Sequence, residues 1–464
     1  MEDTMRNDGT GRLDPGELAS LGVTTVMVAA PDMTGALFGR RIPAGSLRRV
    51  LESGVEVCTA ALSWDVTQEP LVDQQWTGFH TGWHDMTLVP DLTTLRLLPW
   101  LPATALCLAD VVEYPGGPLL EVAPRTVLRR QTERLAAMGL RALVATELEF
   151  YLYEGTPAEL RRRGHRDLVP TTVVRSDFAL GGTNHMEPFF DRVRRSLAEA
   201  GIEVESTQAE WGLGQWELGL DHGDPLSVAD RHTVFKMAVR DIAAANGYTA
   251  TFMARPRGDQ PGSSCHIHIS LVDGDDRPVF ATEGAGLRSD PLGAMATAMR
   301  EALAGMIDMA PDTMLFMAPN VNSYTRLAHP EFAGNGLQWG HDNRTTSFRV
   351  VGHSPTTMRI EHRLGGADLN PHLGVAAILA GVRHGLEAGL QPGPPTIGNG
   401  YEQTATGLPT DLADAAARFG RSLRCREAFG DGVVDHYREV ARAEVRVARA
   451  AVTDWEIGRY FDSV

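Results

Sequence analysis

Metal-binding and phosphate-binding side chains occupy every second position in four segments of the sequence, 147–152, 215–218, 265–271 and 358–363. The polar positions hold Glu147, Glu149, Gln215, Glu217, His266, His268, Ser270, Arg359, Glu361 and Arg363, and the positions between them are mostly apolar. Neighbouring side chains on a strand point to opposite faces. The pattern therefore predicts four strands, each with one apolar face and one face of carboxylates, imidazoles or guanidinium groups.

Four amphipathic strands with a solvated outer face would give the same alternation. Such a face usually carries lysine, threonine, serine and glutamine in no special order. Here the polar faces are dominated by groups that bind metals or phosphates, and this happens four times in one chain. We therefore favour a shared functional site over four unrelated solvated faces.

Glutamate and histidine side chains are ligands of Mg²⁺ and Mn²⁺. Two carboxylates that are two residues apart on a strand, such as Glu147 and Glu149, lie roughly 6–7 Å apart and can serve two neighbouring ions. Asn343, Arg344 and Arg349 precede the last of the four strands and add two cations. Paired ions with arginines suit phosphoryl transfer, because they neutralise charge on the moving group. The sequence lacks the phosphate-binding loop G-x-x-x-x-G-K-[ST].

These strands need a scaffold, and the chain predicts one small and one large domain. Residues 15–112 are rich in short strands, and 113–464 alternate between strands and helices. In the larger part we expect strands over 141–153, 202–208, 215–220 and 249–254, and helices over 124–138, 187–200, 230–245 and 412–446. Pro124 suits the start of a helix, and Gly139 suits its end.

The composition narrows the partners and the compartment. The formal net charge of −16 over 464 residues argues against nucleic acid or an anionic membrane as the main partner. The four cysteines form no C-x-x-C pair and no disulfide framework, which indicates free thiols in a reducing compartment. The first residues lack the apolar core of a signal peptide, and no apolar stretch is long enough for a membrane helix. We expect a cytoplasmic protein.

Six segments resemble the signature blocks of glutamine synthetases and occur in the order found in that family. They are Glu147-Leu-Glu149-Phe, 210–217, 251–253 with 262–268, 322–326, Asn343-Arg344 and 359–363. The resemblance implies an α+β fold with a small N-terminal β-grasp domain and a large catalytic domain. The catalytic domain would hold a curved antiparallel sheet flanked by helices.

The resemblance also implies roles for individual residues. One metal ion would be held by Glu149, Glu210 and Glu217, and a second, nearer the nucleotide, by Glu147, His266 and Glu361. Contacts to ATP would come from Glu205, His268, Ser270 and Arg359, with Arg344 and Arg349 on the phosphates. Gly262, Arg326 and Arg363 would bind L-glutamate.

The family reaction implied by this resemblance needs ATP and Mg²⁺ or Mn²⁺. ATP phosphorylates the γ-carboxylate of glutamate, and a nitrogen nucleophile then displaces phosphate. Members assemble as two stacked rings, often hexameric, so we expect a homododecamer. Its active sites would lie between subunits, with the small domain of one subunit covering the catalytic domain of the next.

Three positions depart from the family pattern. Phe332 stands where a flap glutamate would bind ammonium, Ser63-Trp64-Asp65 stands where an Asp-Gly-Ser-Ser block would, and Thr356 replaces a lysine. An apolar wall in place of a carboxylate favours an organic amine, because a small cation needs charge to offset its desolvation. The chain thus looks closer to the γ-glutamylpolyamine, γ-glutamylethanolamide and γ-glutamylanilide synthetases. Asp65 and Glu331 are the candidate bases.

Three alternatives stay open at this point. The chain could be an authentic glutamine synthetase that uses ammonia, which Phe332 disfavours. It could be a non-catalytic structural member of the family, although all six expected metal ligands are present. A guanidino kinase, a relative in fold, is disfavoured by the glutamate-binding residues Arg326 and Arg363.

Overall fold

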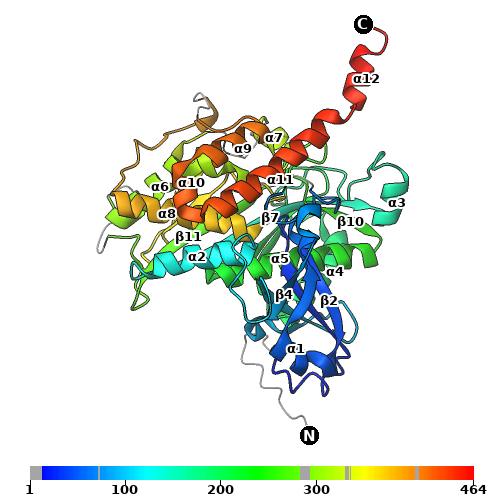
Figure 1. Cartoon of the computed structure of the whole chain (residues 1–464). Helices are drawn as coiled ribbons and strands as arrows, with labels where there is room; N and C mark the ends of the chain where they lie inside the picture. The colour runs from blue at the N-terminus through cyan, green and yellow to red at the C-terminus, as the bar shows by residue number, and fades with distance from the viewer. Residues whose placement is uncertain (1–12, 72–73, 283–292, 330–333, 335, 403–406) are drawn as a thin grey trace.

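The structure is a computed structural model that describes residues 13–71, 74–282, 293–329, 334, 336–402 and 407–464. The N-terminal strands extend from one side of a larger body of helices and sheet, and the C-terminal helix projects away from that body (Figure 1). None of the helices within these described ranges is long and apolar enough to cross a lipid bilayer.

The N-terminal part is a six-stranded mixed sheet with one α-helix. Its elements are β1 (Thr25–Pro31), β2 (Leu37–Pro43), α1 (Leu47–Ser53), β3 (Val55–Cys58), β4 (Asp85–Pro90), β5 (Arg96–Leu97) and β6 (Thr104–Val112). The order is β2-β1-β6-β4-β3, with β5 beside β6, and β1 runs parallel to β6. Asp32 turns β1 into β2, because its Oδ1 accepts hydrogen bonds from the Thr34 and Ala36 amides at 2.8 and 3.0 Å. This topology agrees with the β-grasp domain expected from the sequence.

The larger part is built on an eight-stranded sheet. Its strands are β7 (Leu140–Glu154), β8 (Val204–Ala209), β9 (Gln215–Gly223), β10 (Tyr248–Thr251), β11 (Cys265–Asp273), β12 (Trp339–His341), β13 (Phe348–Val351) and β14 (Arg359–His362). The order is β12-β13-β14-β11-β7-β9-β8, with β10 also paired to β7. All pairs are antiparallel except β12 with β13, so the sheet departs from the expected antiparallel pattern at that edge.

Helices cover the apolar face of this sheet. The helices of the larger part are α2 (Pro124–Ala136), α3 (Pro157–Arg162), α4 (Glu187–Glu199), α5 (Pro225–Ala245), α6 (Thr297–Met317), α7 (Val321–Leu327), α8 (Pro371–Ala388), α9 (Leu412–Arg421), α10 (Leu423–Phe429), α11 (Asp431–Ala450) and α12 (Asp454–Tyr460). Helices α2 and α5 pack on β7, and α8 packs on α2, α5 and α6. Leu148, Phe150, Ile267 and Ile360 on the sheet are all fully buried. The alternation read from the sequence therefore separates a covered apolar face from a polar one.

Helices α6 and α8 approach each other closely because both carry glycines at the contact. A Cβ atom at Gly385 would lie 1.9 Å from the Glu301 carbonyl oxygen, and one at Gly305 would lie 2.2 Å from the Gly381 oxygen. No other residue type fits such a backbone approach. Helix α8 of this pair packs on α2 and α5, and those two helices pack on the sheet.

One expected boundary was wrong. Helix α5 begins at Pro225 rather than at 230, because Asp224 caps it by accepting from the Leu226 and Ser227 amides. The expected helical segment 412–446 consists of three helices, because Ser422 caps α10 and Gly430, with a φ of +92°, separates α10 from α11. The other expected elements occur with small shifts at their ends.

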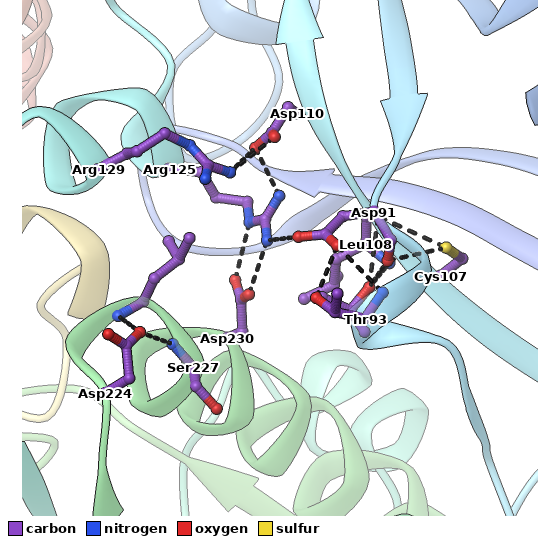
Figure 2. A network of polar contacts seen from close by, with 12 residues as sticks. Asp91, Thr93, Cys107, Leu108, Asp110, Arg125, Arg129, Asp224, Ser227 and Asp230 are labelled. Carbon is purple, nitrogen blue, oxygen red and sulfur yellow. Dashed lines mark hydrogen bonds and ion pairs between the residues drawn. The ribbon is translucent and has the colours of Figure 1, made fainter. Parts of the chain in front are cut away.

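A buried arginine joins the two parts of the chain. Arg125 on α2 binds Asp91 and Asp110 of the N-terminal part at 2.9 and 2.6 Å, and Asp230 of α5 at 2.9 Å (Figure 2). One continuous apolar core also spans both parts. The predicted domain boundary at residue 112 coincides with the end of β6. Because the two parts share one core, their division into two domains stays a prediction.

Candidate active site

The four strands predicted to carry chemistry lie side by side as β14, β11, β7 and β9. Their register places Glu147 opposite His266, Glu149 opposite Glu217, and His268 opposite Glu361. Cross-strand partners of this kind have side chains on the same face of the sheet. The polar faces therefore form one continuous surface of carboxylates and imidazoles.

Glu147 is the centre of this surface. His268 Nε2 lies 2.9 Å from Glu147 Oε1, and His266 Nδ1 lies 3.5 Å from both Glu147 Oε2 and Glu361 Oε1. Two groups have ligand atoms within 4.8 Å of one another, Glu147 with His268 and Glu361, and Glu147 with Glu217 and His266. Because both groups share Glu147, the geometry suits two neighbouring cations bridged by one carboxylate.

The carboxylates on the β8–β9 side are held by amides. Gln208 Nε2 donates to Glu210 and Glu217 at 3.0 and 2.9 Å. Glu149 Oε2 accepts from Gln215 Nε2 and from the Ser264 amide, both at 2.9 Å. These neutral donors orient three carboxylates without neutralising them.

The pKa values of Glu210 and Glu217, on the β8–β9 side, are raised, whereas the pKa of Glu361 on β14 is lowered. Burial and then the charges of Glu147, Glu149, Glu210 and Glu361 raise the pKa of Glu217 to about 10. Burial, followed by Glu149, raises the pKa of Glu210 to about 8. Burial alone would raise the pKa of Glu361 too, but Arg363, His266 and His268 outweigh it and lower it to about 2.

A buried carboxylate cluster with raised pKa values fits a divalent cation, because a cation would replace the missing positive charge. The Nε2 atom of His266 is also buried and has no hydrogen-bond partner among the described residues. Burial lowers the pKa of His266, so its ring is neutral at pH 7, as a metal ligand must be. The residues present therefore fit a divalent cation. The two groups differ from the expected ligand sets, because His268 takes part in one of them and Glu149 and Glu210 take part in neither, so the expected sets stay a prediction.

Two cavities lie beside the carboxylates. One of about 360 Å³ is lined by Glu147, Glu205, His268, Ser270, Thr356 and Arg359, which include four of the six residues expected to contact ATP. In it Arg359 Nε donates to His268 Nδ1 at 3.2 Å. The second, of about 750 Å³, is lined by Arg344 and Arg349, the other two. Arg349 Nη1 lies 2.9 Å from Glu361 Oε2 and so connects this cavity to the cluster.

A family model described as the catalytic domain of glutamine synthetase matches residues 121–460. The chain belongs to the glutamine synthetase family. It is 40% identical to the γ-glutamylethanolamide synthetase of Streptomyces coelicolor, over 95% of this chain and 93% of that protein. It is 34% identical to the glutamate–isopropylamine ligase of a Pseudomonas species, over 95% of this chain and 96% of that protein.

A solved structure supports the fold. Ligand-free GmaS superposes with a TM-score of 0.82 at 24% identity, and the match covers 97% of this chain and 99% of that one. The family membership and this likeness confirm the fold class expected from the sequence. The two sequence relatives given above are named for organic amines.

The residues that this family would use for glutamate lie next to Glu149. Arg326 is fully buried, and its terminal nitrogens donate to the Leu364 oxygen, the Ser264 hydroxyl and the Arg363 oxygen at 3.0, 2.8 and 3.2 Å. A Cβ atom at Gly262 would lie 2.6 Å from Arg326 Cγ, so only glycine fits there. Arg326 thus holds the segment that carries Arg363. A direct contact of Arg326, Arg363 or Gly262 with glutamate stays a prediction.

Asp65, one of the two predicted bases, is not brought to this surface within one chain. Asp65 Oδ1 accepts from the Thr67 amide and hydroxyl, both at 2.7 Å, and from the Glu69 amide at 3.0 Å, which closes a turn. Its side chain lines a different cavity, with Trp64, Phe316 and Glu444. Glu331 and Phe332 lie outside the described residues.

The sequence did not single out Gln208 or Asp177. Gln208 lies on the expected strand 202–208, but nothing in the pattern marked it as the shared donor to two glutamates. Asp177 lies in an irregular segment, where no periodicity predicts the direction of a side chain. Burial raises the pKa of Asp177, and the charge of Arg344 opposes that shift.

Proposed function

We propose that the chain is an ATP-dependent ligase that joins the γ-carboxylate of L-glutamate to an organic amine. The observation that carries this is the sheet surface on which Glu147 is shared by two groups of cation ligands. Relatives that cover nearly the whole chain and are named for ethanolamide and isopropylamine ligation support the organic acceptor. ATP, two divalent cations and the residue roles given above are parts of the same proposal.

The reaction has two steps. The γ-phosphoryl group of ATP passes to the γ-carboxylate, which gives ADP and an acyl phosphate, and the amine nitrogen then displaces phosphate to form the amide. A carboxylate is a poor electrophile at neutral pH, and the acyl phosphate is not. The cations, when bound, neutralise charge on the migrating group.

The residues of this chain supply position and charge. The resemblance assigns Glu149, Glu210 and Glu217 to one cation and Glu147, His266 and Glu361 to the other. In the structure Glu147 lies instead with His268 and Glu361, and with Glu217 and His266, so His268 would be a further ligand candidate. Arg344 and Arg349, which line one cavity, would bind phosphate oxygens. Arg349 and Arg363 both contact Glu361, so the phosphate side and the glutamate side meet at one buried carboxylate.

The choice of nucleophile is tested by a panel of nitrogen donors. We expect the best of ethanolamine, isopropylamine, putrescine, spermidine and aniline to exceed ammonia in kcat/KM by about 10-fold or more, because an apolar acceptor wall favours a carbon body. Phosphate release and the product mass measure this with ATP, glutamate and Mn²⁺. Fastest turnover with ammonia would instead identify a glutamine synthetase. Metal binding without any turnover would indicate a structural member of the family.

We also propose a homododecamer of two hexameric rings in the cytoplasm. The end of the chain carries exposed apolar side chains, including Trp455, Ile457, Phe461 and Val464. Such a concentration is costly in water and supports burial against another copy. Asp65 lies apart from the carboxylate surface of its own chain, which supports an active site completed by a neighbour. All four cysteines are free thiols, which supports a reducing compartment.

A further inference from the structure

A cavity of about 510 Å³ lies between the N-terminal sheet and helix α5. Residues 34–37, at the turn from β1 into β2, line one side of it, and α5 lines another. Thr251 at the end of β10 and the next two residues, Phe252 and Met253, also line it. The cavity shares no lining residue with the two cavities beside the carboxylates. It is therefore a different space from the proposed active site.

Helix α5 turns two cations toward this cavity. Thr233, Lys236, Met237 and Arg240 line it at offsets of three, four and seven residues, so they belong to one face of the helix. The Lys236 ammonium lies 5.2 Å and the Arg240 guanidinium 5.0 Å from the centre of the Phe252 ring. Two positive charges one helical turn apart repel each other. This arrangement is stabilised by negative charge placed between them.

The protein supplies little of that negative charge in direct contact. No carboxylate oxygen in the part of the chain that the structure describes lies within 4.0 Å of a Lys236 or Arg240 nitrogen. Lys236 Nζ donates one hydrogen bond, to the Ala367 oxygen at 2.8 Å. Arg240 donates none to the described residues, and its side chain is exposed. An ammonium group has three N–H donors and a guanidinium has five, so most of these donors are left for a ligand or for water.

Two carboxylates line the same cavity, but each is bonded to other groups. Asp241 Oδ2 accepts from the Trp100 indole at 3.1 Å. Asp368 Oδ2 accepts from Asn320 Nδ2 at 2.8 Å and from the Ser323 hydroxyl at 2.6 Å. These bonds hold both carboxylates outside salt-bridge distance of the two cations.

The electrostatics of Lys236 agree with this geometry. Burial, followed by the charge of Arg240, lowers the pKa of Lys236 to about 8, and Asp368 opposes that shift only in part. A lysine in this state gains from a further negative group nearby, because the charged form of the side chain is then favoured.

We infer that this cavity binds a small organic anion, whose carboxylate or phosphate group lies against Lys236 and Arg240. Charge-assisted hydrogen bonds from the two cations hold that group. Leu37, Val66 and Met237 line the same cavity and would contact a carbon body. The volume suits a ligand of metabolite size. Because both the N-terminal sheet and α5 supply walls, the bound anion would stabilise the junction between the two parts of the chain.

A rival role for the two cations is to pack on Phe252 and do nothing else. Under that role, no anion binding depends on Arg240. A second rival places the anion on Arg344 and Arg349, in the cavity assigned to phosphate. The variants Arg240→Gln and Arg344→Gln separate the two cavities, because each removes a charge from one of them.

The experiment titrates the whole chain with succinate, and separately with inorganic phosphate, by isothermal titration calorimetry at constant ionic strength. We expect Arg240→Gln to weaken the binding of at least one probe about 10-fold or more, and Arg240→Lys to stay within about threefold of the wild type. The probe that is affected shows whether the site takes a carboxylate or a phosphate.

The matched control is Arg192→Gln, an exposed arginine of α4, which packs on α5 and contributes Arg192 to none of the cavities described above. It should bind both probes as the wild type does. Arg240 donates no hydrogen bond to the described residues, so Arg240→Gln should fold and keep the melting temperature of the anion-free wild type. The affected probe should raise that temperature in the wild type and less in Arg240→Gln.

Binding of both probes that is unchanged in Arg240→Gln would overturn the inference, and so would a wild-type chain that binds neither probe. Binding that is lost in Arg344→Gln but kept in Arg240→Gln would assign the anion to the proposed active site instead. None of these readouts involves turnover, so the result does not depend on the proposed function.

Discussion

Replacing Glu361 with glutamine is expected to lower kcat for amide formation by about 10³-fold in a chain that still folds. Glu361 is 1% exposed, lies opposite His268 and Arg349 in the sheet register, and contacts Arg363. Glutamine keeps the shape and one oxygen but removes the charge. Phosphate release at saturating ATP, glutamate and amine measures the loss, and the Mn²⁺ concentration needed for half-maximal rate should rise.

The matched control is Glu199→Gln at the exposed end of α4, outside every cavity described above. It should retain wild-type kinetics. If Glu361→Gln were fully active, Glu361 would be no cation ligand and the second ion would need other residues. The low pKa of Glu361, about 2, means that the wild-type carboxylate is charged at all working pH values, so the loss should not depend on pH.

Replacing Arg125 with methionine is expected to destabilise the chain by about 3–5 kcal/mol, because it leaves buried carboxylates without their counter-charge. Asp230, Asp91 and Asp110 all converge on this guanidinium, whose side chain is 2% exposed (Figure 2). Urea unfolding followed by fluorescence measures the change. Arg129→Met is the control, since Arg129 is 29% exposed and pairs with Asp110 alone, and it should cost about 1 kcal/mol or less.

The acid limb of the stability curve should change as well. Burial would raise the pKa of Asp230, but Arg125 and His372 outweigh it and lower the value to about 2, below the ordinary 3.8. This contribution is complete above pH 3.8 and is lost as the pH falls toward 2. An Arg125→Met chain loses this contribution, so its deficit in unfolding free energy should be largest above pH 3.8 and should narrow as the pH falls toward 2. An Arg125→Met chain as stable as the wild type would show that the junction is held by its apolar core alone.

The sheet could be predicted from the sequence because its signal is local. Polar and apolar residues alternate with a period of two around Glu147 and Glu149 and around His266 and His268. The pairing of β7 with β11 then places these four side chains on one face of the sheet. Arg349, which lies on the strand before β14, contacts Glu361, and Arg344 lines a cavity together with Arg349. Their phosphate-binding role stays a prediction. Short-range patterns therefore predicted the centre of the site.

The rest depends on contacts between distant parts of the chain. Arg125 is distant in sequence from Asp91 and Asp230, so no local pattern predicts their ion pairs. The cap formed by Asp224 starts α5 at Pro225, earlier than the sequence pattern indicated. The Phe178 amide donates to the Ala209 oxygen, so the segment around it is placed by β8 rather than by its own neighbours in sequence. Likewise, the resemblance pointed to Asp65 as an acceptor-site group, but within one chain Asp65 closes a turn elsewhere. Such positions follow from tertiary packing, which a one-dimensional pattern does not contain.

The central claim is that glutamate is activated as an acyl phosphate before the amine attacks. Glutamate labelled with oxygen-18 in its γ-carboxylate tests it most directly, with ATP, Mn²⁺ and ethanolamine and mass analysis of the products. We expect each released phosphate to carry one labelled oxygen and the γ-glutamyl amide to keep the other. Amide formed with unlabelled phosphate, or with label in AMP, would contradict the account, because the γ-carboxylate would then not have received the γ-phosphoryl group.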